Sequence, residues 1–472
     1  MKLVKSLLLG SAAGIAAVAG AQAADLPSRK AAPVEYVRVC STYGAGFFYI
    51  PGTETCLRVG GRVRAEYGTM ERFARSQDGY GFRARGRINI DARTATAYGT
   101  LRTFVRFEMT NSNGVYGQSF NGNGAYAGAT RGGAAGTFNT LASAAGAAAG
   151  SNANNGQFTY NLDKAFIQFG PITAGRAQSF FDFYADDLNY GVIRGSDLAS
   201  NLIAYTATFG SGISATVSLE DRSEREVSNG ITTNIAGVSS ATLGGQTIPD
   251  VVGNINITQG WGSAQLSGAL LQRNTTGPIG TTGFGSGTNL SNDDQYGFAV
   301  QGGVKINLPM LAAGDYLWLQ AAYAEGGLSY LGYGGQGQGS TWGSTSRAGR
   351  ISITNSDVAL DAIGKAHLTK GYALTAGLLH YWTPTIRQGV YGSYSKLDYS
   401  AAVSTLDPRE IRVGTNLIWS PVAGLDIGVE VLYARVEAAK RVAAYTADQA
   451  FTGRTIKADD TFQGRVRIQR DF

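Results

Sequence analysis

The sequence predicts an all-β fold: a closed, antiparallel barrel of sixteen strands that spans a membrane. Three features predict it: a strand pattern at the end of the chain, an export signal at its start, and a strand-rich composition. From Phe462 to Phe472, alternate residues are mostly apolar and the residues between them are polar or charged. This period of two is typical of a strand with one apolar face. A soluble edge strand rarely ends on an aromatic residue. In a membrane barrel the last strand must pair with the first, so Phe472 is expected to close the barrel.

The first residues predict a signal peptide rather than part of the fold. Lys2 and Lys5 precede an apolar run, and Ala21-Gln-Ala23 is a small-x-small cleavage site. We therefore expect residues 1–23 to be removed after Ala23. The alternative is a membrane anchor, but an apolar run of about 15 residues is short for a spanning helix.

The composition favours many strands with polar loops. Glycine is abundant at 66 residues, aromatic residues make up 10%, and Met and His number only 4 and 2. Such usage disfavours a helical enzyme core. After the signal, no segment has 18 uninterrupted apolar residues, which excludes spanning helices. The net charge of +6 does not indicate nucleic-acid binding, because the arginines alternate along strands instead of clustering.

The two cysteines, Cys40 and Cys56, are expected to form a disulfide. An exported chain meets an oxidising compartment, where such pairs form. Closing this loop should stabilise the chain by about 3 kcal/mol. The alternatives are a metal site and a reactive thiol, but no His or third Cys lies near them in the sequence.

The stretch from Glu35 to Arg64 contains the run Phe-Tyr-Ile-Pro-Gly-Thr-Glu-Thr-Cys-Leu and both cysteines. It closely resembles the N-terminal signature of the porins of alphaproteobacteria such as Brucella and the rhizobia. The resemblance extends to the end of the chain, more loosely in the loops. It implies a trimeric, 16-stranded barrel of the outer membrane that passes small hydrophilic solutes. We expect residues 24–56 to form a periplasmic N-terminal segment and residues 57–472 to form the barrel.

Three early strands place a row of cations on one face. In 81–93, the odd positions from Arg83 onward are polar or charged and the even positions are small or apolar; 57–69 and 101–109 show similar alternation. The alternative is a solvated face of a soluble sandwich. In a membrane barrel, an arginine facing lipid at the midplane costs about 2–4 kcal/mol, so these side chains should face water inside. The candidate residues of a basic pore wall are Arg62, Arg64, Arg83, Arg85, Arg87 and Arg106.

The segment 179–200 follows the fifth predicted strand and mixes aromatic residues with carboxylates. In porins the loop after the fifth strand folds inward and narrows the channel, so the resemblance implies a constriction loop here. Aromatic side chains would pack the loop on the inner wall while the carboxylates project into the pore. The alternative is an exposed acidic loop with a calcium site. The candidate acidic residues of the constriction are Asp182, Asp186, Asp187 and Asp197.

Short turns should alternate with long polar loops, as in barrels whose turns face the periplasm and whose loops face outside. The segment 357–363 stays in a loop, because a seventeenth strand would put Phe472 on the wrong side. The segment 372–382 is apolar on both faces, which the barrel pattern does not explain. The predicted strands are 57–69, 81–93, 98–110, 158–169, 172–178, 201–210, 212–221, 251–260, 263–272, 295–307, 315–328, 369–382, 386–399, 409–420, 424–438 and 459–472.

A barrel of this width cannot be filled by its own side chains, so it should hold water. We expect passive diffusion of small hydrophilic solutes and ions, with a transverse field between the arginines and the loop carboxylates. A channel selective for a sugar or an anion is the alternative, and a surface adhesin is a further one. Catalysis is not expected, because His367 and His380 lie in no catalytic motif. We expect no cofactor, no metal and no nucleic acid. The expected partners are two further copies in a homotrimer, outer-membrane lipid and lipopolysaccharide, and the barrel assembly machinery.

Overall fold

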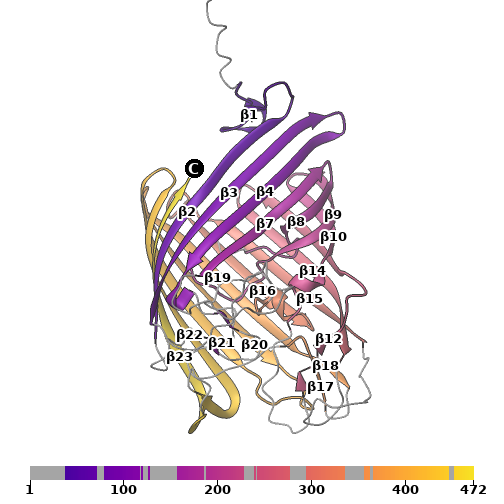
Figure 1. The fold of residues 1–472 in the computed structure, drawn as a ribbon, viewed down its shortest axis with the longest axis vertical. Helices are drawn as coiled ribbons and strands as arrows, with labels where there is room; N and C mark the ends of the chain where they lie inside the picture. The colour runs from indigo at the N-terminus through magenta and orange to yellow at the C-terminus, as the bar shows by residue number, and fades with distance from the viewer. Residues whose placement is uncertain are drawn as a thin grey trace, which may run out of the picture. The chain divides into compact units, whose positions relative to one another are not determined.

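The computed structural model describes residues 38–71, 79–116, 119–120, 126–127, 157–184, 188–227, 239–240, 242–276, 294–334, 356–361, 365–445 and 451–472 (Figure 1). The predicted signal peptide lies outside this range. The chain divides into two compact units, Met1–Leu57 and Arg58–Phe472, and each is described by itself. Among the described residues, no helix has the length and apolar character needed to cross a membrane.

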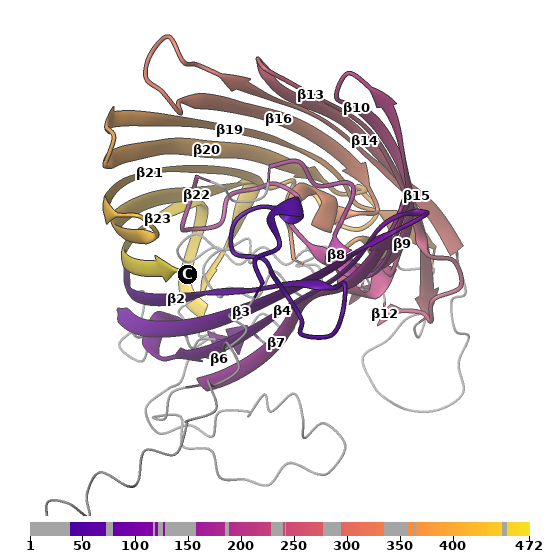
Figure 2. The ribbon, with the colours of Figure 1, turned by 90° about the horizontal axis from the view of Figure 1, so that it is seen from above.

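In the described residues, sixteen strands pair in antiparallel fashion, each with its neighbour in the chain, and the last pairs with the first. Figure 2 shows them as a ring. The predicted closed barrel is therefore confirmed, with a strand at each of the sixteen predicted places. The strands are β2 (Cys56–Met70), β3 (Tyr80–Thr96), β4 (Gly99–Ser112), β7 (Gln157–Phe169), β8 (Ile172–Gln178), β9 (Ala199–Gly210), β10 (Ile213–Glu220), β13 (Asp250–Gln259), β14 (Gly262–Thr276), β15 (Asp294–Asn307), β16 (Tyr316–Glu325), β19 (Lys370–Thr383), β20 (Ile386–Asp398), β21 (Arg409–Val422), β22 (Leu425–Tyr445) and β23 (Phe451–Asp471).

Closure of the ring depends on the end of the chain. The strands β2 and β23 pair from Arg62 opposite Asp471 to Met70 opposite Gln463. Beyond them, Gly61 and Phe472 exchange two backbone hydrogen bonds of 2.9 and 3.0 Å. A Cβ on Gly61 would lie 2.6 Å from the Phe472 ring, so glycine is needed for this approach. No strand edge is left open to lipid at this seam.

Side chains alternate between the two faces of the wall, as the period of two requires. In β21, Ile411, Val413 and Leu417 are exposed, whereas the alternating residues Glu410 and Arg412 are buried. The exposed apolar face is the one that meets hydrocarbon, and the other lines the lumen. Arg470 is on the outer face but sits beside a short turn, where its guanidinium donates to the Ala423 carbonyl. At this place near the end of the strand, a long cationic side chain can reach the head groups.

Short and long connections alternate along the chain, so the strand ends that the long connections join all lie at one end of the barrel. The described part of the segment predicted to be a loop, residues 357–361, forms no strand of the barrel wall, as predicted. Its strand β17 (Val358–Leu360) joins a small separate sheet with β11 (Ser239–Ser240) and β18 (Ala366–Leu368). The outer end of the last hairpin, β22–β23, extends beyond the predicted strand ends by 7 residues on β22 and by 8 on β23. Its outer part carries charge in both alternating rows, so alternation could not reveal it.

The first unit contains the predicted disulfide. Cys40 and Cys56 are bonded, with their Cα atoms 5.9 Å apart. Both are buried with Phe47, and the Cys40 amide donates to the Phe47 carbonyl at 2.9 Å. The strand β1 (Phe48–Tyr49) pairs with Cys56 and Leu57. The crosslink and this pairing together hold the described part of the segment in a compact fold.

Candidate functional site

The connection between β8 and β9 comprises residues 179–198; we call it the inner loop. Its described residues, 179–184 and 188–198, lie inside the barrel (Figure 2). Its hydrogen bonds go to strand residues that alternate with exposed apolar ones, which places it on the lumen side of the wall (Figure 2). These bonds reach β13, β16 and β21: Asn254 Nδ2 to the Phe180 carbonyl (2.6 Å), the Tyr184 amide to Gln320 Oε1 (3.0 Å), and Asn416 Nδ2 to the Leu188 carbonyl (2.6 Å).

Aromatic and aliphatic side chains pack the inner loop against this side of the wall. The Phe183 and Tyr184 rings meet Trp318 edge-on, with centroids 4.6 and 5.5 Å away. Leu188 packs in the same cluster as Leu379 of β19. The lumen face of β19 is therefore apolar because the loop covers it. This contact explains why 372–382 is apolar on both faces.

A second stretch also folds into the lumen: residues 326–334, which follow β16 and which we call the second inner segment. It contains a 3-10 helix, η5 (Leu328–Leu331), whose four residues are all buried. Tyr330 Oη donates to Asp250 Oδ2 at 2.9 Å, and Tyr333 Oη lies 2.6 Å from Ser395 Oγ. The sequence predicted that the strand would continue to residue 328 and that a loop would follow, but it did not predict the inward course. Together the two segments cover the lumen face of the wall between β13 and β21.

Arg194 joins the two segments to the wall. Its guanidinium forms two hydrogen bonds of 2.8 Å with Glu410 of β21 and donates to the Gly332 carbonyl at 2.6 Å. It also lies 3.9 Å from the centre of the Tyr333 ring. Arg412 contributes a second cation to Glu410, with Nε 2.5 Å from Oε1. These three charged residues are at most 3% exposed, so their charges must be compensated within the group.

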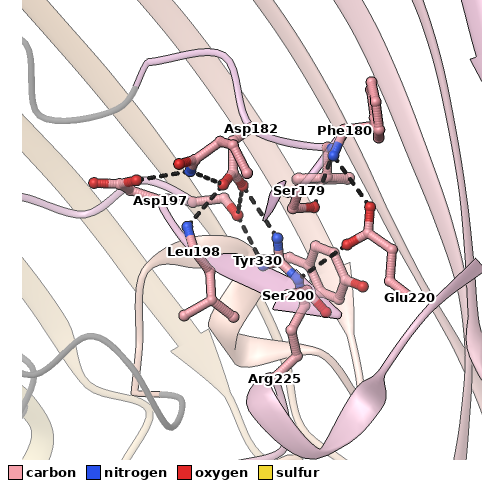
Figure 3. A network of polar contacts seen from close by, with 12 residues as sticks. Ser179, Phe180, Asp182, Asp197, Leu198, Ser200, Glu220, Arg225 and Tyr330 are labelled. Atoms are coloured by element: carbon pink, nitrogen blue, oxygen red, sulfur yellow. Dashed lines mark hydrogen bonds and ion pairs between the residues drawn. The ribbon is translucent and has the colours of Figure 1, made fainter. Parts of the chain in front are cut away.

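The carboxylate of Asp182 belongs to a buried network of polar contacts (Figure 3). We expected its carboxylate in the water of the channel, but its side chain is only 1% exposed. It accepts hydrogen bonds from the Leu198 amide at 2.7 Å and from Gln178 Nε2 at 2.6 Å. Arg225, from the connection after β10, donates to it at 3.2 Å. Ser196 Oγ is the fourth hydrogen-bond donor to this carboxylate. Because four donors compensate its charge, the carboxylate can be buried.

Arg225 brings a third connection into the network. Its guanidinium lies 4.1 Å from the centre of the Tyr330 ring and 3.9 Å from Glu220 Oε2. Glu220 in turn accepts from the Phe180 amide at 3.1 Å. The inner loop, the connection after β10 and the second inner segment thus meet at one buried cation (Figure 3).

Asp197 is the described loop carboxylate that keeps partial contact with solvent. It accepts a hydrogen bond of 2.8 Å from Gln178 Nε2. Partial burial, and then the nearby charge of Asp182, raise the pKa of Asp197 to about 6. Asp186 and Asp187, the other two predicted acidic residues, lie outside the described residues.

The predicted wall arginines all face the lumen, on β2, β3 and β4. The sequence pattern suggested a row of free cations. Instead, each has a partner on a neighbouring strand, because lumen-facing carboxylates and amides occupy the cross-strand positions. The contacts are Arg62–Asp471 (2.5 Å), Arg64–Gln469 (3.0 Å), Arg83–Glu66 (2.5 Å), Arg85–Glu108 (3.6 Å), Arg87–Glu108 (2.5 Å) and Arg106–Asp163 (3.3 Å).

We use the name arginine wall for the lumen faces of β2, β3, β4, β7 and residues 463–471 of β23. Several of its guanidinium groups keep contact with solvent; the Arg62 and Arg106 side chains are 28% and 23% exposed. Pairing leaves an excess of positive charge. The cations are Arg62, Arg64, Arg83, Arg85, Arg87, Arg93, Arg102, Arg106, Lys164, Arg465 and Arg467, and the carboxylates are Glu66, Asp91, Glu108, Asp163 and Asp471.

The inner loop also reaches β22 and, through Arg467, the arginine wall. The Glu430 carboxylate accepts the Gly191 amide at 2.7 Å, and Arg467 lies 3.7 Å from the centre of the Tyr190 ring. Sequence reasoning missed Arg194, Glu410 and Glu430, because each meets its partner only through the closure of the barrel. The one signal for them in the sequence was the row of polar residues that alternates with apolar residues along β21 and β22.

Neither histidine belongs to this site. His367 Nε2 lies 2.9 Å from Asp361, and His380 Nδ1 lies 2.6 Å from Asp315 beside a short turn. Within the described ranges, no three His, Cys, Asp or Glu side chains gather in an arrangement suited to a metal ion.

A closed barrel with an apolar exterior and a charged lumen defines an outer-membrane channel of the porin class. Comparison with known proteins agrees. The model of the Porin subfamily matches residues 25–465, and the chain belongs to that family. It is 31% identical to porin Omp2b of Brucella suis biovar 1 (strain 1330) over 382 residues, which cover 78% of this chain and 88% of that protein. It is likewise 31% identical to porin Omp2b of Brucella neotomae over 405 residues, covering 83% and 92%.

Among solved structures, the chain resembles the outer membrane channel DcaP of Acinetobacter baumannii. The TM-score is 0.58 at 15% identity, with 90% of this chain and 99% of that chain covered, so this likeness concerns the fold alone. The expected family is confirmed, and the protein is a multi-pass β-barrel of the outer membrane.

Proposed function

We propose that this porin conducts small hydrophilic solutes and ions by passive diffusion, through a passage between the inner loop and the arginine wall. The observation that carries the proposal is the unequal filling of the lumen. Buried apolar clusters occupy the side from β13 to β21, whereas guanidinium groups on β2, β3 and β4 remain partly exposed. Solvent therefore has its path along the arginines.

In this proposal the field across the narrow section is weaker than free charges would make it. Wall carboxylates compensate part of the arginine charge, and Arg225 compensates Asp182. The field then arises from the excess cations of the arginine wall and from Asp197 on the inner loop. Asp186 and Asp187 are further candidates from the sequence. A solute that is polar can align in such a field, whereas an apolar solute must displace ordered water.

A channel with a preference for anions is the second candidate, and the excess of cations on the arginine wall favours it. An excess of positive charge near a narrow section raises the local concentration of anions. General diffusion and anion preference are compatible, since one concerns the size limit and the other the charge of the permeating solute.

Planar bilayers with a salt gradient test the proposal. The D186N/D187N variant should shift the reversal potential toward anions; no shift would mean that the loop does not line the narrow section. Liposome swelling with sugars of increasing size separates general diffusion from a selective channel. A smooth size limit supports diffusion, and one sugar taken up out of order contradicts it.

The family resemblance also leads us to propose a homotrimer, since oligomers of membrane barrels are closed and symmetric. Light scattering of the detergent-solubilised protein, corrected for bound detergent, measures the number of chains. A mass of three chains supports the trimer and a mass of one contradicts it.

A further inference from the structure

A group of aromatic side chains lines the lumen between the inner loop and the turn that joins β15 to β16; we call it the aromatic patch. Its members are Phe183, Tyr316, Trp318 and Tyr381. All but Trp318 are half-buried, so part of their ring surface stays in contact with solvent. The turn, residues 308–315, is one of the short connections, which face the periplasm in barrels of this kind. The aromatic patch therefore lies in the periplasmic half of the lumen.

Lys305 is the cation of the aromatic patch. Gly303, two residues earlier in β15, faces the inner loop, because a Cβ there would lie 2.3 Å from the Phe183 ring. Side chains two residues apart in a strand share a face, so Lys305 also points into the lumen. Its Nζ lies 4.1 Å from the centre of the Tyr316 ring and 5.3 Å from that of Trp318. These ring contacts position the ammonium group but do not neutralise its charge.

The strands beside Lys305 offer it no carboxylate. Ser263 of β14 and Trp318 of β16 lie directly opposite it. At the next lumen-facing position, opposite Gly303, these strands carry the amides Gln265 and Gln320. Among the residues that the structure describes, none forms an ion pair with Lys305.

The carboxylate closest to Lys305 along the sequence is bound elsewhere. Asp315 lies 2.6 Å from His380 Nδ1 and accepts the Tyr381 amide at 2.8 Å. The predicted wall arginines differ from Lys305, because each has a carboxylate or amide partner on a neighbouring strand. Lys305 therefore keeps an uncompensated charge on the lumen face.

Trp318 is a second donor without an acceptor. Its side chain is 6% exposed, and in the described part of the chain its indole Nε1–H has no hydrogen-bond partner. A buried donor left without an acceptor is unfavourable. Because Trp318 lies directly opposite Lys305, one cross-strand pair presents two donors that lack an acceptor. A carboxylate group beside this pair is the acceptor that it lacks.

We propose that the aromatic patch binds planar aromatic monocarboxylates inside the channel. The carboxylate pairs with Lys305 Nζ, and the ring of the solute packs against the half-buried rings of the patch. Ion pairing selects an anion, and aromatic rings pack favourably with one another in offset or edge-on arrangements. A neutral sugar would leave Lys305 without an anion, and an inorganic anion would leave the rings in water. This site rests on the proposed function, because the channel must first deliver the solute to it.

Single-channel recording of the whole protein in potassium chloride provides the test, with 2-naphthoate as the probe. Each bound naphthoate should partly interrupt the current, and the length of the interruption measures how long the solute stays. Two control solutes each lack one half of the recognised chemistry. Acetate has the charge without the rings, and 2-naphthylmethanol has the rings without the charge, so neither should give resolved interruptions.

Three variants locate the site. K305Q removes the ammonium group and should shorten the naphthoate interruptions at least about tenfold, because a charged hydrogen bond is lost. Y316L keeps an apolar side chain but removes the ring, and should shorten them about threefold. K164Q is the matched control, since it removes a lysine from the arginine wall instead. It should leave the length of each interruption unchanged, even where the weaker field lowers their frequency. A steady open-channel current in each variant shows that the barrel is folded.

Interruptions of equal length in K305Q and the wild type overturn the proposal, and so does an equal shortening in K164Q. A wild type that conducts ions but does not respond to naphthoate also overturns it, while passive diffusion stands. If naphthoate interrupts the current only in D186N/D187N, those loop carboxylates already neutralise Lys305 and the site does not bind solutes.

Failure of passive diffusion would be seen separately, as a wild-type protein that carries no current. Calorimetric titration of the detergent-solubilised protein with 2-naphthoate then tests the site without any need for permeation. Binding heat in the wild type that is lost in K305Q supports the site, and absence of binding heat in the wild type overturns it.

Discussion

Arg194 and Glu410 meet inside the barrel in a two-point ion pair, with Nε–Oε1 and Nη2–Oε2 distances of 2.8 Å. Arg194 belongs to the inner loop and Glu410 to β21, 216 positions further along the chain. Both side chains are almost fully buried. Breaking such a pair leaves a charge without compensation, which costs about 3–5 kcal/mol. Because Arg194 also holds Gly332, this one residue connects the inner loop, the second inner segment and the wall.

R194M should therefore loosen the inner loop. We expect a larger mean conductance with more open-channel noise in single-channel recordings, because the loop then moves relative to the wall. R441M, which changes an exposed arginine of the outer hairpin, should conduct as the wild type does. An R194M channel as quiet and as narrow as the wild type would show that the pair does not hold the loop.

The charge of Asp197 should make ion selectivity depend on pH. The pKa of this carboxyl is raised to about 6, so it is ionised at pH 7 and becomes protonated as the pH falls to 5. Loss of this negative charge should shift the reversal potential toward anions. A unit charge about 5 Å from a passing ion in water changes its energy by about 0.8 kcal/mol, an upper limit of roughly fourfold in relative permeability.

D197N should show the anion-shifted value already at pH 7 and little change down to pH 5. If the variant keeps the full pH dependence of the wild type, another group is responsible and Asp197 does not face the permeating ions.

Adjacent glycines of β15 should respond in opposite ways to the same substitution. A Cβ at Gly303 would lie 2.3 Å from the Phe183 ring of the inner loop, whereas one at Gly302 meets nothing within 4 Å. G303V should push the loop toward the arginine wall and lower the conductance, at a stability cost of about 1–3 kcal/mol. G302V should leave conductance unchanged. Equal conductance in both variants would contradict the packing of Phe183 on the wall.

Arg87 and Glu108 should have opposite effects on ion preference. Their side chains are paired at 2.5 Å, on a wall with an excess of cations. R87Q removes a cation and should shift the reversal potential toward cations. E108Q removes the carboxylate that Arg85 and Arg87 share, and should shift it toward anions. Shifts in the same direction, or none, would mean that ions do not pass along this wall.

The pattern of alternating residues was sufficient to predict the barrel. Each strand has one face in hydrocarbon and one in water, so apolar and polar residues alternate along its sequence. Alternation does not mark the outer part of β22–β23, because no hydrocarbon covers this part and charges are tolerated on both of its faces. It could not explain β19, whose lumen face is apolar because Leu379 packs on the inner loop.

The candidate site was predictable in part. The lumen-facing arginines follow from the same alternation, but their partners Glu66 and Glu108 depend on which residues lie opposite each other across strands. The position of Asp182 was not predictable, since its burial depends on Arg225 from another connection.

The sequence by itself determined the cysteine pair, the sixteen strands and the side of each strand that faces water, because these depend on local composition and on residues one or two positions apart. Only the tertiary structure decided how the lumen is divided. That division depends on contacts such as Arg194 with Glu410 and Phe183 with Trp318, which join residues more than 100 positions apart. Which charges are buried and compensated, and which stay in contact with solvent, is settled only when the closed barrel brings those residues together.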